Sequence, residues 1–382
     1  MFDYIIIGAG MTGAVMAERI ASQLGKRVLI IERRNHVGGN CYDYFDDAGI
    51  LVHKYGPHIF HSKSAEVWQY LSQFTEWNIY QHKVLAAVDG VEIPVPFNLN
   101  SLKLIYPQQL ANSLTAKLIS QFGYGRRVPI LDLLNTDDSE LKMLAQFIYD
   151  KIFVNFTYKQ WGLRPEELED YVMARVPVIV SHDDRYFADE FQGVPRYGYT
   201  KMFESMLAHQ NIKLMLNTDY RELLTVNHHT KQIKFMNQLF EGKLIYTGKI
   251  DELFDFCYGE LPYRSLDFKF ITLFQTQYQA AGTIHYPNDY DFTRITEMKQ
   301  LTGQNHPFTT IVQEFPRACG RKDIPYYPVP QPQNHELFTR YQQRAAEYPN
   351  IIFSGRLADY RFYDMHEAVS MALNKFAQDL GR

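Results

Sequence analysis

A glycine-rich turn near the N-terminus constrains the fold more than any other feature of this chain. An apolar run at residues 4–7 leads directly into the sequence G-A-G-M-T-G at residues 8–13, and a second apolar run at residues 28–31 ends at Glu32. The G-x-G-x-x-G pattern therefore stands between a predicted strand and a predicted helix, with an acid about twenty residues further on. This arrangement is typical of the βαβ unit that binds a dinucleotide.

Each residue of the pattern has its own expected task in holding a dinucleotide. Gly8 permits the tight turn, Gly10 lets the backbone approach a pyrophosphate, and Gly13 allows close packing of strand and helix. Glu32 would accept hydrogen bonds from a ribose. The first turn of the helix would point unpaired N–H groups and the positive end of its dipole at the phosphates. A tight βα turn without a ligand is the alternative interpretation.

The residues after Glu32 indicate which dinucleotide is bound. They read R-R-N-H-V-G-G-N over residues 33–40, so a basic pair and a second glycine pair follow the ribose acid. The pattern E-x-R-x-x-x-G-G occurs at this point in one large group of flavoproteins, and its glycines would let the chain pass close to a rigid isoalloxazine. An ordinary glycine turn would look the same in isolation, but together with the first pattern the segment favours FAD. The cofactor-binding residues expected here are Arg33, Gly39 and Asn40.

Length, charge and cysteine content limit the possible folds and partners. A chain of 382 residues is too long for one simple core, so two or three domains are expected. The net charge of −4 argues against nucleic acid or an anionic membrane as a main partner. The three cysteines are far apart in the chain and match no metal-site spacing, as expected for reduced thiols of a cytoplasmic protein. A first strand at residue 3 leaves no room for a signal peptide, and no apolar run reaches the roughly 18 residues that span a bilayer.

The order of strand-like and helix-like segments predicts an α/β protein with insertions. Helical periodicity prevails from Leu102 to Leu168, whereas strand signals separated by turns lie on both sides. We therefore expect a discontinuous Rossmann-like FAD-binding domain, an inserted helical domain and an antiparallel sheet domain. The predicted boundaries are 1–80, 197–250 and 318–382 for the FAD-binding domain, 98–172 for the helical bundle, and 81–97, 173–196 and 251–317 for the antiparallel β-sheet domain. The ligand cleft would lie where the carboxyl ends of the strands meet the insertions.

Six further segments form a pattern that is far more specific than the nucleotide motif. They are Y-G-P-H-I-F-H at 55–61, T-Y-K-Q-W-G at 157–162, D-D-R-Y-F at 183–187, F-Q-G-V-P at 191–195, T-R-I-T-E at 293–297 and G-R-L-A-D-Y-R-F-Y-D-M at 355–365. In this order and spacing, the chain resembles the bacterial UDP-galactopyranose mutase family. The resemblance runs over essentially the whole chain, and residues 220–263 are its least familiar stretch.

The resemblance implies a flavin enzyme that rearranges a six-membered sugar ring into a five-membered one on its nucleotide diphosphate. N5 of reduced FAD attacks the anomeric carbon and displaces the nucleotide, the ring opens and closes again through O4, and the nucleotide returns. No net redox change occurs, but the flavin must be kept reduced by an external reductant such as NADPH. UDP-galactose is the leading substrate implied, dTDP-fucose-type sugars and UDP-N-acetylgalactosamine are alternatives, and a homodimer is the family-level expectation.

The resemblance also assigns residues to the diphosphate, the sugar nucleotide and the flavin. Arg175 and Arg294 match the two arginines that hold the diphosphate, whose negative charge grows as it leaves. His58 and His61 fall next to the flavin, and a metal site there is not expected because no third ligand follows at a useful spacing. The substrate-binding residues implied are Phe153, Phe156, Thr157, Trp161, Tyr186, Arg264, His285, Tyr327 and Phe362. The C-terminal residues implied to hold the flavin are Arg356, Tyr360, Asp364 and Met365, and those with a catalytic role are Arg175, Arg294 and His61.

Four positions depart from the family pattern, three of them at the nucleotide end. Phe156 replaces a tyrosine that lies against the base, and Ile152 replaces an aromatic residue that often covers the other face of the base. His285 replaces an asparagine near the base and ribose, and Phe362 lacks a hydroxyl that commonly reaches the diphosphate. These departures weaken the expectation of uracil, and the branched side chain of Ile152 would suit the methyl group of thymine.

Two other classes of function share parts of this pattern. An FAD amine-oxidase-like oxidoreductase would have the same N-terminal motifs, but it would reduce its flavin with a substrate and consume oxygen. A sugar-nucleotide-binding protein without catalysis would bind the ligand and show no flavin absorbance.

Overall fold

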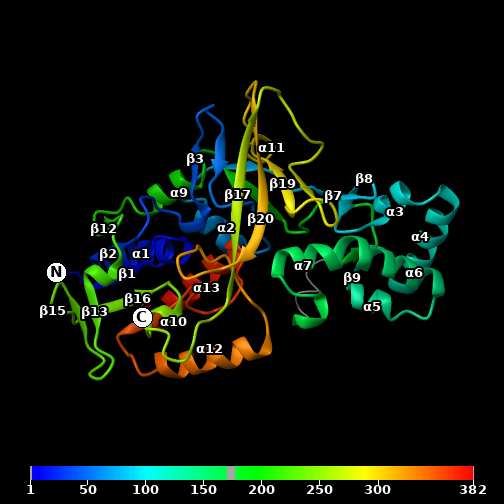
Figure 1. The fold of residues 1–382 in the computed structure, drawn as a ribbon. Helices are drawn as coiled ribbons and strands as arrows, with labels where there is room; N and C mark the ends of the chain where they lie inside the picture. The colour runs from blue at the N-terminus through cyan, green and yellow to red at the C-terminus, as the bar shows by residue number, and fades with distance from the viewer. Residues whose placement is uncertain (1, 170–176, 382) are drawn as a thin grey trace.

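The fold is built around a five-stranded parallel sheet in the order β12-β2-β1-β16-β22 (Figure 1). It is seen in a computed structural model that describes residues 2–169 and 177–381. The strands are β1 (Tyr4–Ile7), β2 (Val28–Ile31), β12 (Ile212–Met215), β16 (Lys243–Tyr246) and β22 (Ile351–Phe353). All of them come from the three segments expected to form the dinucleotide-binding domain, which confirms the Rossmann-like fold predicted from the glycine pattern.

Alternate residues of the central strands bury both faces of this sheet. Ile6 and Ile30 pack in one core with α1 (Met11–Leu24), α9 (Tyr199–Met206) and α13 (Met365–Asp379). Ile5 and Ile7 point to the other face, as the period of two in a strand requires. That face is covered by the elements β13 (Leu224–Val226), β14 (Ile233–Phe235), α10 (Ile250–Leu253) and α12 (Pro332–Ala345). Strand β15 (Gln238–Leu239) pairs with β14 and is exposed.

A second, seven-stranded sheet has the order β21-β17-β20-β19-β18-β7-β8. Its strands are β7 (Val84–Val88), β8 (Val91–Val95), β17 (Tyr263–Leu273), β18 (Thr283–His285), β19 (Arg294–Glu297), β20 (Thr309–Ala318) and β21 (Tyr327–Pro328). Every pair is antiparallel except β18 with β7, which is parallel. The expected antiparallel sheet is therefore mixed at this one junction, where two segments far apart in sequence meet without a hairpin to set their direction.

The segment 173–196, assigned from the sequence to the antiparallel sheet, joins other parts of the fold instead. Within its described residues, β11 (Phe191–Pro195) pairs with β5 (Phe60–Ser62) and β6 (Trp77–Ile79). The Trp68 ring holds this small sheet together, because it stacks 4.4 Å from Trp77 and 5.4 Å from Phe191. Strand β10 (Val178–Ile179) pairs with β9 (Arg127–Val128) of the helical region.

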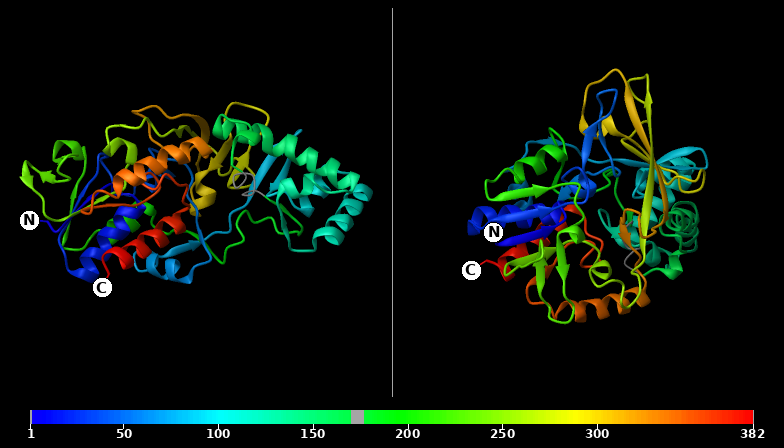
Figure 2. Two further views of the ribbon diagram at one scale, coloured as in Figure 1. Left: turned by 90° about the horizontal axis from the view of Figure 1, so that it is seen from below. Right: turned by 60° about the vertical axis from the view of Figure 1, so that its left-hand side comes forward.

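The helical region lies at the end of the molecule remote from both chain termini (Figure 2). Its helices are α3 (Leu99–Ile105), α4 (Gln108–Phe122), α5 (Ile130–Leu134), α6 (Ser139–Ile148) and α7 (Asn155–Trp161). Helices α3 to α6 share a core with the β7–β8 hairpin. A π-helical turn, Tyr149–Val154, joins α6 to α7, and such turns are frequent at functional sites. Helix α7 lies against β20 and so connects the helices to the large sheet.

The remaining regular elements are short and lie between these units. They are β3 (Asp43–Phe45), β4 (Leu51–His53), α2 (Ala65–Leu71) and α11 (Met298–Thr302). Within the described part of the chain, the helices are too short or too polar to traverse a lipid bilayer.

Substituting the last glycine of the β1–α1 turn tests this packing. A Cβ atom at Gly13 would lie 2.0 Å from the carbonyl oxygen of Gly8, which belongs to the backbone and cannot rotate away. Gly13→Ala should therefore lower the free energy of unfolding by about 1–3 kcal/mol, as overpacking does. At Gly10 the nearest atom would be 3.8 Å away, so Gly10→Ala is a matched control that should retain stability. Urea unfolding of the apoprotein measures both, and equal stability of the two variants would contradict the prediction.

Candidate cofactor and substrate site

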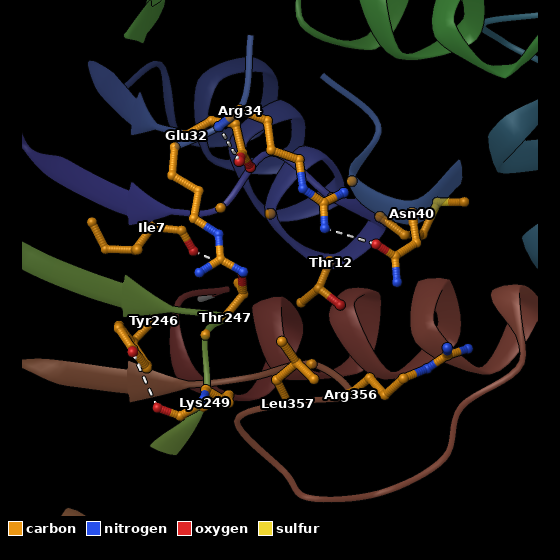
Figure 3. A pocket seen from close by; sticks show the side chains of 18 of the residues that line it. Ile7, Thr12, Glu32, Arg34, Asn40, Tyr246, Thr247, Lys249, Arg356 and Leu357 are labelled. Carbon is orange, nitrogen blue, oxygen red and sulfur yellow. Dashed lines mark hydrogen bonds between the residues drawn. The ribbon is translucent and has the colours of Figure 1, made fainter. Parts of the chain in front are cut away.

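A cavity opens at the carboxyl ends of β1, β2, β12, β16 and β22, where a Rossmann-like sheet binds its ligand (Figure 3). It is bordered by the β1–α1 turn, the segment after β2 and the start of α13. The predicted cofactor-binding residues that line it are Gly8, Gly10, Gly13, Glu32, Arg33, Gly39, Asn40, His58, Arg356 and Met365. Asp364 does not line this cavity. It borders a neighbouring hollow at the beginning of α13 instead.

The two glycine patterns of the sequence pack directly on each other. The Gly38 N–H donates to the Ala9 carbonyl oxygen at 2.8 Å. A Cβ atom at Gly39, whose φ is +57°, would lie 2.9 Å from the Gly10 Cα. The second glycine pair is therefore required by contact with the first turn, in addition to any contact with a flavin.

The Glu32 carboxylate ties these two segments together. It is 6% exposed, and one oxygen accepts the Ala9 N–H while the other accepts the Arg34 N–H, both at 2.9 Å. Each carboxylate oxygen has a second lone pair, so the side chain retains the capacity to accept a ribose hydroxyl. Its backbone partners explain why the acid is buried at this point.

Arg34 is a cavity residue that was not singled out in the sequence, where Arg33 was named instead. Both side chains line the cavity, but Arg33 is largely exposed, whereas Arg34 points across toward Asn40 (Figure 3). The Arg34 Nη2 donates to Asn40 Oδ1 at 2.9 Å, and its guanidinium lies 4.5 Å from the centroid of the Tyr55 ring. Its Nη1 is buried and has no hydrogen-bond partner among the described residues. The signal was available, since the arginine of an E-x-R pattern that begins at Glu32 is Arg34.

His58 is held in the neutral state on the cavity wall. Burial, followed by the nearby His53 ring, lowers the pKa of His58 to about 3. Its Nδ1–H donates to the Gly56 carbonyl oxygen at 2.8 Å, and its backbone N–H donates to His53 Nδ1 at 3.0 Å. Burial also lowers the pKa of His53 to about 4. The Nε2 atom of His58 is therefore an acceptor at neutral pH.

His61, expected to have a catalytic role, is not part of the cavity lining. Its Nδ1 lies 2.5 Å from Asp189 Oδ2, its ring stacks on Phe187 at 3.7 Å, and His366 meets it edge-on at 5.0 Å. The Nε2 atom lies 3.9 Å from Asp364 Oδ2 at the start of α13. Asp189 thus fixes the orientation of the ring.

A row of aromatic and histidine rings extends from His61 to Arg294 and brings together residues predicted to bind the substrate. After Phe187, each ring lies between 4.7 and 6.3 Å from the next. The Arg294 guanidinium ends the row, 5.8 Å from the last ring. In order, the members after Phe187 are His82, Tyr186, His285, Phe156 and Arg294. Phe153 and Thr157 are buried in the adjoining π-helical turn and α7.

Arg294 carries the positive charge of this row and is partly buried. It pairs in register with Glu314 of the neighbouring strand, with Nε 3.3 Å from Glu314 Oε1. Burial lowers the pKa of Arg294, but Glu314, Tyr327 and Tyr186 more than compensate, so the net shift is upward and the guanidinium stays charged. Burial raises the pKa of the Glu314 carboxyl group, and Arg294 opposes that rise. Glu314 was not identified from the sequence, because its role depends on the register of β19 with β20.

A second row of side chains links the substrate side to the cofactor cavity. The ring of Trp161 lies 5.9 Å from Tyr327, Tyr327 lies 5.4 Å from Phe362, and the Arg356 guanidinium lies 4.8 Å from the Phe362 ring. Arg356 itself lines the cofactor cavity. The structure thus brings together four residues that the resemblance had assigned to two different ligands.

Arg264, expected to bind the substrate, donates hydrogen bonds to the end of helix α7. Its Nε donates to the Gln160 carbonyl oxygen at 2.9 Å and its Nη2 to the Lys159 carbonyl oxygen at 3.2 Å. These carbonyls belong to the last turn of the helix, where they have no intrahelical partner. Arg264 therefore positions the adjacent Trp161, and contact with a ligand would have to use Nη1 or the second N–H of Nη2. Arg175 lies outside the described residues.

Comparison with known proteins gives a consistent set of relatives. A family model described as UDP-galactopyranose mutase matches residues 151–362, and one described as an NAD(P)-binding Rossmann-like domain matches residues 6–74. A probable UDP-galactopyranose mutase of Klebsiella pneumoniae is 36% identical over 374 residues, which cover 97% of this chain and 93% of that protein. A dTDP-fucopyranose mutase of Escherichia coli is also 36% identical, over 98% of this chain and 97% of that protein.

A solved structure shares the fold over the same length. The crystal structure of a reduced UDP-galactopyranose mutase has a TM-score of 0.77 to this chain at 17% sequence identity. The match covers 100% of this chain and 94% of the other.

The buried neutral histidines predict loss of stability in acid. Because the pKa of His58 falls from 6.5 in the unfolded chain to about 3 in the fold, the unfolded state binds more protons between these values. The free energy of unfolding is thus unaffected by His58 above about pH 6.5 and decreases as the pH falls below that value. Near pH 5 the decrease is about 1.4 kcal/mol per pH unit. His58→Asn should lower the slope of the free energy of unfolding against pH by about 1.4 kcal/mol per pH unit near pH 5. Urea unfolding at several pH values measures this slope.

A second histidine provides the control for this measurement. His229 is exposed, so His229→Asn should leave the pH dependence of the free energy of unfolding unchanged. A His58→Asn variant with the same slope as the wild type would show that His58 is not held neutral by the fold.

Proposed function

Because this chain belongs to the UDP-galactopyranose mutase family, we propose that it is a flavin-dependent isomerase that interconverts pyranose and furanose forms of a nucleotide-diphosphate hexose. The observation that carries the proposal is the row Trp161–Tyr327–Phe362–Arg356, which joins the partly buried charge of Arg294 to the cofactor cavity. A diphosphate at Arg294 would place its sugar between that charge and the flavin.

The residues of the cavity fit FAD. Two glycine turns leave the backbone open toward the ligand, and the first turn of α1 contributes unpaired N–H groups. Glu32 retains acceptor capacity for a ribose, and the buried Arg34 Nη1 would find an anionic partner in the pyrophosphate. When bound and reduced, FAD would supply a nucleophilic N5 for the anomeric carbon of the sugar.

The residues of the chain would bind the diphosphate and stabilise its charge. As the bond between the anomeric carbon and the diphosphate breaks, negative charge grows on the phosphate oxygens. Arg294 would meet that charge in a partly buried setting, where electrostatic interactions are stronger than in bulk water. Glu314 keeps the guanidinium in place, and burial lowers the pKa of Arg294 by less than Glu314, Tyr327 and Tyr186 together raise it.

UDP-galactose is the leading substrate of this proposal, and dTDP-fucose is the main alternative. One relative is named for the first sugar nucleotide and one for the second, at the same identity. At the nucleotide end Phe156 stacks on His285 at 4.7 Å, and Ile152 is buried nearby in the π-helical turn. These are the side chains that would contact the base, so the nucleotide preference must be measured for this chain.

A panel of nucleotide sugars on dithionite-reduced holoenzyme tests the reaction and its substrate together. We expect a furanose product from UDP-galactose, dTDP-fucose or UDP-N-acetylgalactosamine, separated by chromatography, and no product after oxidation in air. Turnover of none of the three would reject the mutase. Substrate-dependent oxygen consumption without dithionite would indicate an amine-oxidase-like oxidoreductase. Binding of the sugar nucleotide by a protein that lacks flavin absorbance at about 450 nm would indicate a sugar-nucleotide-binding protein that is not an enzyme.

Substitution of Arg294 tests the site itself. Arg294→Ala should lower kcat at least about 100-fold, because it removes a donor that acts on charge developing in the transition state. Arg321 is exposed and paired with Glu260, so Arg321→Ala is a matched control expected to retain wild-type turnover. Full activity of Arg294→Ala would show that the diphosphate binds elsewhere.

A further inference from the structure

The side chains proposed to contact the base of the nucleotide come from two different units of the fold. Ile152 and Phe156 lie on the π-helical turn and α7, whereas His285 ends β18 and pairs with Arg294 at the start of β19. Phe156 stacks on His285 at 4.7 Å, and this contact brings the two units together. The space for the base therefore depends on how the β18–β19 loop, residues 286–293, is held against α7.

The β18–β19 loop is packed on itself. The Tyr286 N–H donates to the Thr293 carbonyl oxygen at 2.8 Å, which closes the loop at its base. The rings of Tyr290 and Phe292 stack at 4.9 Å, and Tyr286 meets them edge-on at 5.5 and 5.1 Å. Because these contacts hold the loop in shape, its attachment to the helical region sets where the loop lies.

A lysine of α7 provides one attachment. The Lys159 Nζ donates to the Tyr286 carbonyl oxygen at 2.8 Å and to the Asp289 carbonyl oxygen at 2.9 Å. Burial lowers the pKa of Lys159, although Asp289 and Asp291 favour its charged form. The ammonium group has thus exchanged part of its hydration for two carbonyl oxygens of the loop, and hydrogen bonds from a charged donor are stronger than neutral ones.

An asparagine of the loop provides a second attachment. The Asn288 Nδ2 donates to the Lys151 carbonyl oxygen at 2.9 Å, and its Oδ1 accepts Asn155 Nδ2 at 3.0 Å. The attachment points at residues 151, 155 and 159 flank Phe156 in the chain. The same stretch of helix that carries Phe156 is therefore the one that holds the loop.

We propose that Lys159 is a positioning residue for the nucleotide: by tying the β18–β19 loop to α7, it holds Phe156 and His285 where the base binds. The inference rests on the proposed function, because it takes the nucleotide to bind between these side chains. Arg294 is fixed separately by Glu314 on the neighbouring strand. Lys159 therefore acts on binding of the nucleotide and leaves the charge at the diphosphate in place.

Nucleotide binding to the oxidised, FAD-loaded protein tests this role. The probes are UDP and UDP-galactose, or dTDP and dTDP-fucose if the wild type turns over only the latter, with dissociation constants measured by calorimetry. Lys159→Met removes the ammonium group but keeps an unbranched side chain. It should weaken the nucleoside diphosphate and the nucleotide sugar by the same factor, about tenfold, the scale of one hydrogen bond to a charged group. With reduced enzyme, KM should rise by a similar factor while kcat stays close to that of the wild type.

Two further variants follow the same attachment. Lys159→Arg offers several donors to the same two carbonyl oxygens and should recover most of the affinity. Asn288→Ala removes the second attachment without removing a charge, and it should also weaken both ligands. This variant keeps the inference testable if Lys159→Met does not retain FAD.

Lys299 provides the matched control. Its Nζ also donates to two loop carbonyl oxygens, those of His306 and Phe308, but it lies on α11, beyond the end of β19 that is remote from Arg294. Lys299→Met should leave both dissociation constants unchanged. The same weakening in Lys299→Met would show a general effect of losing a buried lysine and would overturn the specific role of Lys159.

The outcomes also separate this inference from the proposed function. Unchanged affinity of Lys159→Met for the nucleoside diphosphate, or weaker binding of the nucleotide sugar alone, would overturn the positioning role while the wild type remains an active mutase. Weaker binding by Lys159→Met but not by Asn288→Ala would indicate direct contact of the ammonium group with the ligand, which also overturns it. A wild type that turns over no nucleotide sugar under reducing conditions would reject the proposed function and, with it, the inference that depends on it.

Discussion

The site depends on the contact between two segments that leave the central sheet side by side. One carboxylate, that of Glu32, accepts N–H groups from both of them, and Gly39 lies so close to Gly10 that no side chain fits between them. A buried acid is tolerated here because its charge is met by backbone donors. With these segments fixed, Arg34 and the first turn of α1 border one cavity, and the substrate side is positioned relative to it.

The row of side chains from His61 to Arg294, proposed to bind the substrate, contains few charged groups, and their positions are fixed by neighbouring residues. Within the described residues, the row from His61 to Arg294 contains one arginine, which is partly buried, and its charge is balanced by Glu314 on the adjacent strand. The two buried histidines of the row, His82 and His285, are kept neutral by burial, so they do not compete with Arg294 for an anion. An aromatic setting of this kind strengthens the attraction between a guanidinium and a diphosphate, because little water screens it.

Much of the fold followed from local patterns, whereas many of the partners within the site did not. The strand–turn–helix unit, the second glycine pair and the helical insertion each have a short-range signature, and the structure confirms them. The pairing of β11 and the role of Arg264 have no such signature. Arg264 binds carbonyl groups more than 100 residues away, at Gln160 and Lys159, and these pairs depend on how α7 lies on the sheet.

The sequence by itself determined the dinucleotide-binding unit, the family and ten of the residues that line the cavity, because glycine spacing and strand periodicity act within a few residues. Only the tertiary structure decided which of these side chains meet. Glu314 faces Arg294 because β19 and β20 pair in one register. His82 lies beside Tyr186 because segments 104 residues apart in the chain are joined by a backbone hydrogen bond. Such long-range contacts are selected by the packing of the whole molecule, and no local pattern encodes them.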